Sequence, residues 1–157
     1  MEETRMISAD KAEGEEGLLQ YIVVNIGNEL YGIHIGYVDN IVRMQKITRV
    51  PKAQDYFVGV INLRGDVIPV MSIRTRLKLD KDVYTDKSRI IIIKVENASI
   101  GLIVDQVKEV VTFTSDNIEN VSHSFSTLHS NYVTKVGKNN GELISLIDIS
   151  ALLNDND

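Results

Sequence analysis

Apolar and polar residues alternate in short runs along most of this chain, a pattern typical of half-buried β-strands. Runs at 21–26 and 30–35 flank Gly27-Asn28, a dipeptide that favours a tight hairpin turn. A second pair of runs, 58–63 and 67–71, is separated by Arg64-Gly65-Asp66. Further strands are expected at 90–95, 100–104, 107–113, 132–136 and 143–147. The pattern therefore predicts a mainly β protein with many short antiparallel strands.

A few segments have helical features instead. Val38, Ile41 and Val42 follow one another at helical spacing, which predicts a short helix from about residue 37 to 44. Ser72 is placed to cap a brief helix that continues to Leu77. One or two helical turns are expected at 148–153.

An internal repeat indicates the architecture. Residues 21–42 align without a gap with residues 90–111, and Gly32 then lies opposite Gly101. A second segment, 65–77, aligns in the same way with 141–153. Each half of the chain is therefore predicted to contain a hairpin, a short connection, a second hairpin and a helical turn.

Five short antiparallel strands in each half would close into a small barrel, which removes exposed strand edges. Each barrel alone is too small for a large core, so we expect the two to share one core. The expected subdomains are about 19–85 and 86–153. Residues 1–18 are polar and acidic and are predicted to be a disordered tail, as are the last residues, 154–157.

Composition excludes several classes of function. The chain of 157 residues has a net charge of −5 and few aromatic residues, which disfavours phosphate contacts and base stacking. It has no cysteine, its three histidines lack metal-ligand spacing, and no phosphate-binding glycine motif occurs. No apolar run is long enough to insert into a membrane. We therefore expect a cytoplasmic binding protein without catalysis, metal or cofactor. The alternative is a small nucleic-acid-binding β-barrel.

Arg64 is the most informative polar residue. It lies at a turn between two strands, while the repeat places Asn140 at the matching position of the second half. The fold therefore does not require arginine there. Because a guanidinium group donates a rigid fork of hydrogen bonds to carboxylates and carbonyls, we interpret Arg64 as a candidate interface residue.

These segments resemble the CheW family of chemotaxis coupling proteins. The resemblance runs from about Leu19 to Leu153 and is most specific at the NLRG turn followed by VIPV. The segments that carry it are LYGIHIGYVDNIV, ITRVP, GVINLRGDVIPVMSIRTRL, IGLIVDQVKEVV and ELISLIDISALL. It implies two SH3-like barrels and a scaffold function. Such proteins connect methyl-accepting chemotaxis receptors to the regulatory domain of the histidine kinase CheA.

The resemblance also implies which residues contact each partner. Gly59 is the expected kinase-binding residue. The expected receptor-binding residues are Val38, Asn40, Ile41, Asn62, Leu63, Arg64 and Gly65. Asn40 departs from the family, whose members usually have glutamate at this position, so a charge partner for Arg64 is either missing or supplied by Asp39.

Overall fold

The structure is a computed structural model that describes residues 17–121 and 132–154. The chain forms two compact units. Within the described residues, unit 1 contains 17–36, 108–121 and 132–154, and unit 2 contains the continuous segment 37–107. Each unit has its own β-sheet, and the helices are short, which confirms the prediction of a mainly β protein. No helix in the described part of the chain is long and apolar enough to cross a membrane.

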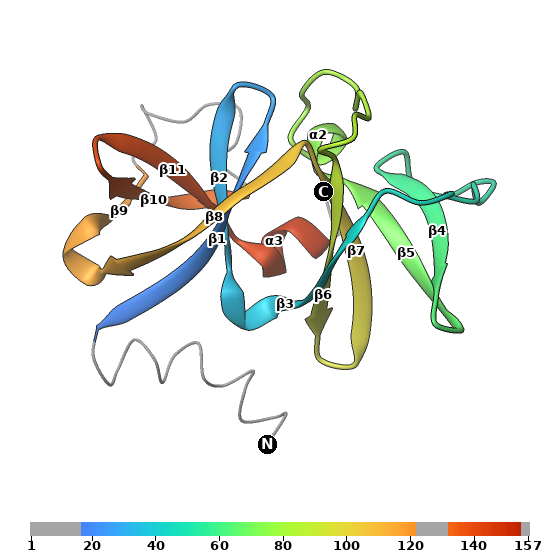
Figure 1. Cartoon of the computed structure of the whole chain (residues 1–157), viewed down its shortest axis with the longest axis horizontal. Coiled ribbons are helices and arrows are strands. Elements are labelled where there is room, and N and C mark those ends of the chain that lie inside the picture. Colours follow the sequence, from blue (N-terminus) through green and yellow to red (C-terminus); the bar gives the residue numbers. More distant parts are fainter. Residues whose placement is uncertain (1–16, 122–131, 155–157) are drawn as a thin grey trace. The chain divides into compact units, whose positions relative to one another are not determined.

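Unit 2 contains a five-stranded sheet with the order β3-β6-β7-β5-β4 (Figure 1). Its elements are β3 (Val38–Arg43), β4 (Phe57–Leu63), β5 (Asp66–Ser72), α2 (Ile73–Arg76), β6 (Arg89–Val95) and β7 (Ala98–Val104). The segment after β3 returns to the opposite edge of the sheet, where Thr48 forms an isolated antiparallel bridge with Val60. Both backbone hydrogen bonds of this bridge are 2.8 Å long. The bridge covers part of edge strand β4, as expected for a small barrel.

Alternate residues of the strands fill the centre of unit 2. The buried cluster consists of Ile61, Ile68, Val70, Ile90, Ile92 and Ile103. Met44 and Ile47, from the returning segment, pack against this cluster. Because β-branched residues suit a pleated surface that is buried on one face, the isoleucine-rich runs of the sequence form its strands.

Unit 1 contains a six-stranded sheet with the order β8-β1-β2-β11-β10-β9. Its strands are β1 (Leu18–Ile26), β2 (Glu29–His34), β8 (Gln106–Thr114), β9 (Ile118–Asn120), β10 (Val133–Asn139) and β11 (Glu142–Ile147). The short helices η1 (Ile35–Tyr37) and η2 (Ser115–Asn117) follow β2 and β8, and α3 (Ile149–Leu153) follows β11. Phe113 is central to the core, where its ring contacts Tyr21 edge to face at a centroid distance of 5.8 Å.

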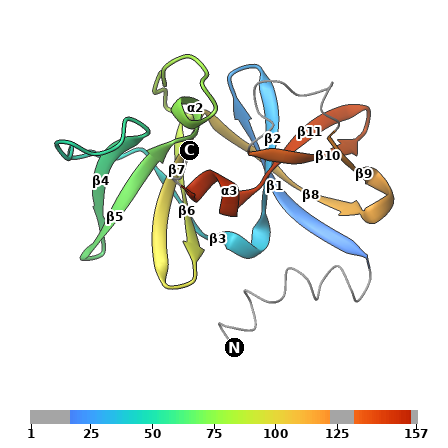
Figure 2. The ribbon, with the colours of Figure 1, turned by 180° about the vertical axis from the view of Figure 1, so that it is seen from behind.

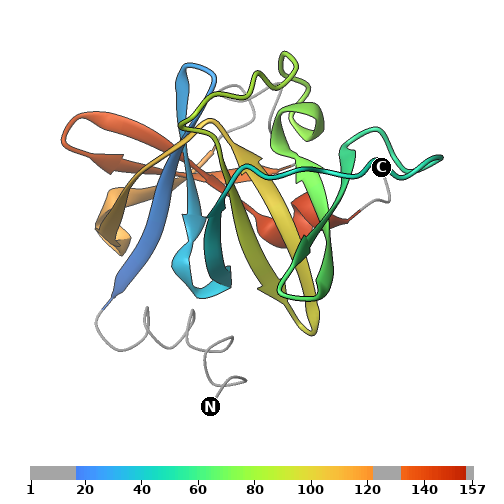
Figure 3. The same cartoon turned by 45° about the vertical axis from the view of Figure 1, so that its right-hand side comes forward.

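The internal repeat is present, but its two halves exchange hairpins. Strand β2 of the first half pairs in parallel with β11 of the second, with Gly32 opposite Leu146. Strand β7 of the second half pairs in parallel with β5 of the first, with Gly101 opposite Val70. Figures 2 and 3 show β1 and β2 beside β11 and β10. The units therefore differ from the predicted subdomains 19–85 and 86–153, because each sheet combines hairpins from both halves.

The helix predicted at 37–44 is wrong. After the single turn η1, the chain forms β3, which pairs antiparallel with β6 through Ile41 and Ile91. Burial along β3 alternates with a period of two residues. The spacing of Val38 and Val42 is compatible both with a strand and with a helix. Pairing with β6 makes the segment a strand. The cap at Ser72 is confirmed, since its hydroxyl accepts a hydrogen bond from the Thr75 amide.

Candidate partner-binding site

The turn between β4 and β5 presents Arg64 at the tip of a hairpin. Leu63 pairs with Asp66, so only Arg64 and Gly65 form the loop. The Asn62 side-chain oxygen accepts a 3.2 Å hydrogen bond from the Gly65 amide, which fixes the turn. Arg64 itself is exposed and makes no hydrogen bond or ion pair with the described residues. Its guanidinium group is therefore available to another molecule.

The backbone of Arg64 is in the left-handed region. Its φ angle is 56° and that of Gly65 is 89°, as a type I′ hairpin turn requires. The corresponding turn in unit 1 has Asn140 and Gly141 with φ angles of 53° and 82°. Asn-Gly is the preferred sequence for this turn, whereas a long side chain at positive φ is strained. Unit 2 thus has arginine at a position where the fold favours asparagine, which suggests a functional reason for Arg64.

Val67 extends this exposed surface and was missed by the sequence analysis. It lies directly opposite Asn62 in the hairpin and is 66% exposed. From the strand pattern alone, Val67 was interpreted as an apolar strand residue with no role in binding. The one available signal was its place two residues after the turn glycine, on the face opposite to buried Ile68. The hairpin tip therefore combines a cation, an amide, the exposed carboxylate of Asp66 and an exposed apolar side chain. We call residues 62–67 the hairpin-tip surface.

The other predicted receptor-binding residues lie on β3, at the opposite edge of the five-stranded sheet from β4. Ile41 is exposed, and Val38 and Asn40 are partly buried. The Asn40 side-chain oxygen accepts a 2.8 Å hydrogen bond from the Ile41 amide. Among the described residues, Asp39 forms no ion pair with Arg64. Asn40 and Asp39 therefore supply no charge partner for that arginine.

Gly59 is buried, and its position is explained by packing. A Cβ atom at residue 59 would lie 2.2 Å from the Thr48 carbonyl oxygen and 2.9 Å from the Ile47 side chain. Only glycine therefore allows the returning segment to approach β4 closely enough for the bridge between Thr48 and Val60. Because Gly59 is buried, it can affect the binding of a partner only through the segment around Thr48, whose packing against β4 it allows.

A cluster of charged residues lies at the far end of the β4–β5 hairpin from the turn. Arg74, from α2, donates two hydrogen bonds to the Asp105 carboxylate and one to the Asp80 carbonyl oxygen. Its Nε atom also lies 3.8 Å from Asp82. The hydrogen bonds to Asp105 raise the pKa of Arg74. This arginine thus fastens the 77–88 connection to the end of β7.

Asp82 is the most unusual carboxylate of this cluster. The Ser72 hydroxyl donates a 2.6 Å hydrogen bond to one of its oxygens, and the other oxygen is buried without a hydrogen-bond partner. Burial raises the pKa of Asp82, although the Ser72 hydrogen bond and Arg74 oppose that effect. No group of three or more metal-ligating side chains occurs among the described residues.

Comparison with known proteins identifies the family. The model of the CheW-like domain matches residues 20–157. The chain belongs to the CheW-like family. It is 36% identical to the chemotaxis protein CheW of Bacillus subtilis over 132 residues, covering 84% of this chain and 85% of that protein. It is 30% identical to CheW of Helicobacter pylori, covering 93% and 88% of the two chains.

A solved structure supports the same assignment. The chain superposes on the crystal structure of the scaffolding protein TtCheW from Thermoanaerobacter tengcongensis with a TM-score of 0.81. The sequence identity is 32%, and the superposition covers 88% of this chain and 94% of that one. Together with the family match, this shows a chemotaxis scaffolding adaptor and gives no support to the nucleic-acid-binding alternative.

Proposed function

We propose that this CheW-like chain couples the cytoplasmic tips of methyl-accepting chemotaxis receptors to the regulatory domain of the histidine kinase CheA. In this proposal the chain acts in the cytoplasm, by binding alone, and needs no catalytic group or cofactor. The observation that carries the proposal is Arg64. It has a strained backbone, no partner among the described residues and an exposed position on a hairpin of a chemotaxis family member.

The receptor is assigned to the hairpin-tip surface and to β3. Arg64 would bind carboxylates or helix-terminal carbonyl groups of the receptor, and Val67 would pack against an apolar side chain beside them. Asn62 and Gly65 would hold the turn in the shape that presents Arg64. Leu63 completes the turn. Val38, Asn40 and Ile41 would contribute a second, weaker contact, since only Ile41 is well exposed.

The kinase is assigned to the surface that depends on Gly59. Because Gly59 is buried, it would act as a positioning residue that keeps the segment around Thr48 against β4. The kinase would contact the exposed residues of that segment. The two partners would then use different parts of unit 2, as a coupling protein requires.

Reconstitution from purified components tests the proposal. The chain, a receptor cytoplasmic fragment and the CheA regulatory domain are mixed, and complexes are separated by size-exclusion chromatography. We expect one complex that contains all three proteins, and we expect the receptor fragment to be lost with Arg64→Ala. Lys94→Ala, which removes an exposed cation from β6 of the same unit, is the matched control. If neither partner elutes with the unaltered chain, the proposal is wrong.

A further inference from the structure

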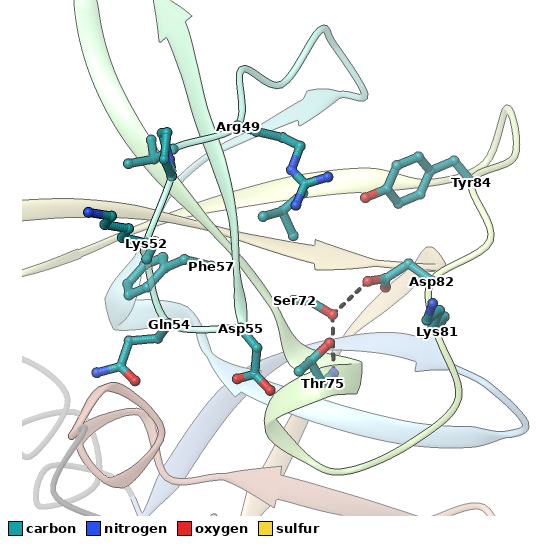
Figure 4. A pocket seen from close by; sticks show the side chains of 14 residues that line it. Arg49, Lys52, Gln54, Asp55, Phe57, Ser72, Thr75, Lys81, Asp82 and Tyr84 are labelled. Atoms are coloured by element: carbon teal, nitrogen blue, oxygen red, sulfur yellow. Dashed lines mark hydrogen bonds between the residues drawn. The ribbon is translucent and has the colours of Figure 1, made fainter.

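Unit 2 contains an open pocket that the proposed receptor surface does not use. It has a volume of about 760 Å³ and is formed by residues 49–58, the start of α2 and residues 81–84. Figure 4 shows Arg49 and Tyr84 pointing toward one another from opposite sides of it. The pocket lies where β4 begins and β5 ends, whereas Arg64 lies at the other end of both strands. A strand of seven residues is about 23 Å long, so the two surfaces are separate.

The pocket lining contains three cations, Arg49, Lys52 and Lys81, and the first two belong to a basic segment of the chain. Arg43, Lys46, Arg49 and Lys52 recur every third residue, all four are exposed, and residues 41–54 contain no carboxylate. This basic segment is unusual in a chain with a net charge of −5. None of the four forms an ion pair or hydrogen bond with the described residues. Their positive charge is therefore not neutralised within the described part of the protein.

Two carboxylates line the pocket, but the negative charge of one of them is already compensated by other residues of the protein. Asp82 is engaged by the Ser72 hydroxyl and lies beside Arg74, which is outside the pocket lining. Asp55 is the other acidic residue of the lining, against Arg49, Lys52 and Lys81. The rim therefore has an excess of positive charge, and it is complementary to an anionic ligand.

Exposed apolar side chains lie at the same place. Val50 is 46% exposed and Tyr84 is 48% exposed, and both line the pocket. Val83, next to Tyr84, is 72% exposed. Phe57 contributes a further apolar wall. Apolar groups of this size beside a concave surface mark a protein-interaction site rather than a site for a small inorganic anion.

We propose that this pocket docks a short acidic peptide segment of a partner protein, with carboxylates on Arg49 and Lys52 and an apolar side chain between Val50 and Tyr84. Arginine pairs with carboxylates through two parallel hydrogen bonds, which makes Arg49 the specificity-determining residue. The overall negative charge of the chain disfavours a nucleic acid or an anionic membrane, whose extended charge would repel the rest of the molecule. A short segment meets only the basic rim.

Nuclear magnetic resonance titration of the full ¹⁵N-labelled chain tests this proposal. The probe is a short acetylated and amidated peptide in which glutamates flank a leucine and a phenylalanine, and the control peptide has glutamine in place of glutamate. We expect saturable shifts at residues 49–58 and 81–84, and about tenfold weaker binding of the glutamine peptide. Added salt should weaken binding of the glutamate peptide, because exposed charge pairs are screened.

Charge-reversal variants separate this surface from others. Each exposed ion pair contributes a factor of about 1.4 to 5 in affinity, and charge reversal adds repulsion between the new carboxylates and the peptide. Arg49→Glu combined with Lys52→Glu should therefore weaken peptide binding about tenfold. Lys94→Glu, on β6, should leave it unchanged. Equal binding of both peptides, shifts confined to other residues, or no saturable binding by the unaltered chain would each overturn the proposal. The receptor assignment does not depend on this result. The proposed kinase surface shares the segment around Thr48 with this pocket, and the separate reconstitution with the CheA regulatory domain tests that assignment whatever the outcome of the peptide titration.

Discussion

A Cβ atom at Gly59 would lie 2.2 Å from the carbonyl oxygen of Thr48, so these two residues can be neighbours only while residue 59 is glycine. The contact joins the start of β4 to a segment that lies eleven residues earlier in the chain. It also brings Thr48 into the bridge with Val60. The barrel of unit 2 therefore depends on this glycine.

Gly59→Ala is expected to destabilise the protein by about 1–3 kcal/mol, because backbone atoms must move to admit the methyl group. Amide hydrogen exchange of Thr48 and Val60 should accelerate more than exchange elsewhere in unit 2, since these two amides donate the bridge hydrogen bonds. Urea unfolding and hydrogen exchange provide the measurements. Gly141→Ala is the control: its φ of 82° makes alanine equally strained, but its Cβ would meet no atom within 4 Å and it belongs to the sheet of unit 1, so it should leave the exchange of both amides unchanged.

The exchange of hairpins between the two halves predicts which fragments fold. Residues 37–107 contain all five strands of the unit 2 sheet together with the bridge from Thr48. We expect this fragment to unfold cooperatively in urea and to give a dispersed amide spectrum. A fragment of similar length, 17–86, contains β2 but lacks β11, the strand with which β2 pairs. It also contains β5 but lacks β7, the strand with which β5 pairs. We therefore expect this fragment not to fold. Cooperative unfolding of 17–86 would contradict the observed pairing.

The buried carboxylate of Asp82 predicts a dependence of stability on pH. Its folded-state pKa is raised by burial, so the folded protein binds this proton more tightly than the unfolded chain does. The contribution of Asp82 to the free energy of unfolding therefore falls as pH rises from the ordinary aspartate pKa through the raised folded value. Asp82→Asn, which keeps an oxygen acceptor for Ser72, should remove this fall.

Urea titrations of both proteins from acid to neutral pH measure the effect. The stability of Asp82→Asn relative to the unaltered protein should increase as pH rises through that window. Asp80→Asn is the matched control, because Asp80 is exposed and accepts its hydrogen bond from Arg74 through the backbone carbonyl oxygen, which the substitution keeps. A relative stability that is constant with pH would show that folding does not raise the pKa of Asp82, and one that falls as pH rises would show that Asp82 is stabilised as a carboxylate.

Much of the fold could be predicted from the sequence because local patterns determine the hairpins. The turns at Gly27 and Arg64 and the repeat that pairs Gly32 with Gly101 are visible in the residues alone. The exchange of hairpins was not visible. Parallel pairing of β2 with β11 joins residues more than one hundred positions apart, and no local pattern distinguishes it from pairing within one half.

The same limit applies to the candidate site. Exposure of Arg64 followed from its turn position, and comparison with Asn140 indicated that arginine was not needed there. The packing role of Gly59 required knowledge that Thr48 returns to β4, which is a long-range contact. The exposure of Val67 was hidden because an apolar residue in a strand is usually assumed to face the core.

The turn at Arg64 allows stability and function to be separated by one substitution. Residues with φ near +60° cost about 1–2 kcal/mol unless they are glycine or, to a lesser extent, asparagine. Asn140 already occupies the corresponding turn of unit 1 with nearly the same φ. Arg64→Asn should therefore raise the free energy of unfolding by about 0.5–1 kcal/mol. Arg64→Ala should change it by no more than about 0.5 kcal/mol, as for an ordinary surface residue.

Receptor binding should change in the opposite direction. A charge-assisted hydrogen bond from Arg64 is worth roughly 1.5–3 kcal/mol, so Arg64→Asn should weaken binding of a receptor cytoplasmic fragment about ten- to a hundredfold. Binding of the CheA regulatory domain should persist, and calorimetric titration against each partner measures both affinities. Asn140→Arg is the reciprocal control: it should lower stability and leave receptor binding unchanged. A variant Arg64→Asn that is less stable and loses both partners equally would show that Arg64 maintains the fold and does not contact the receptor.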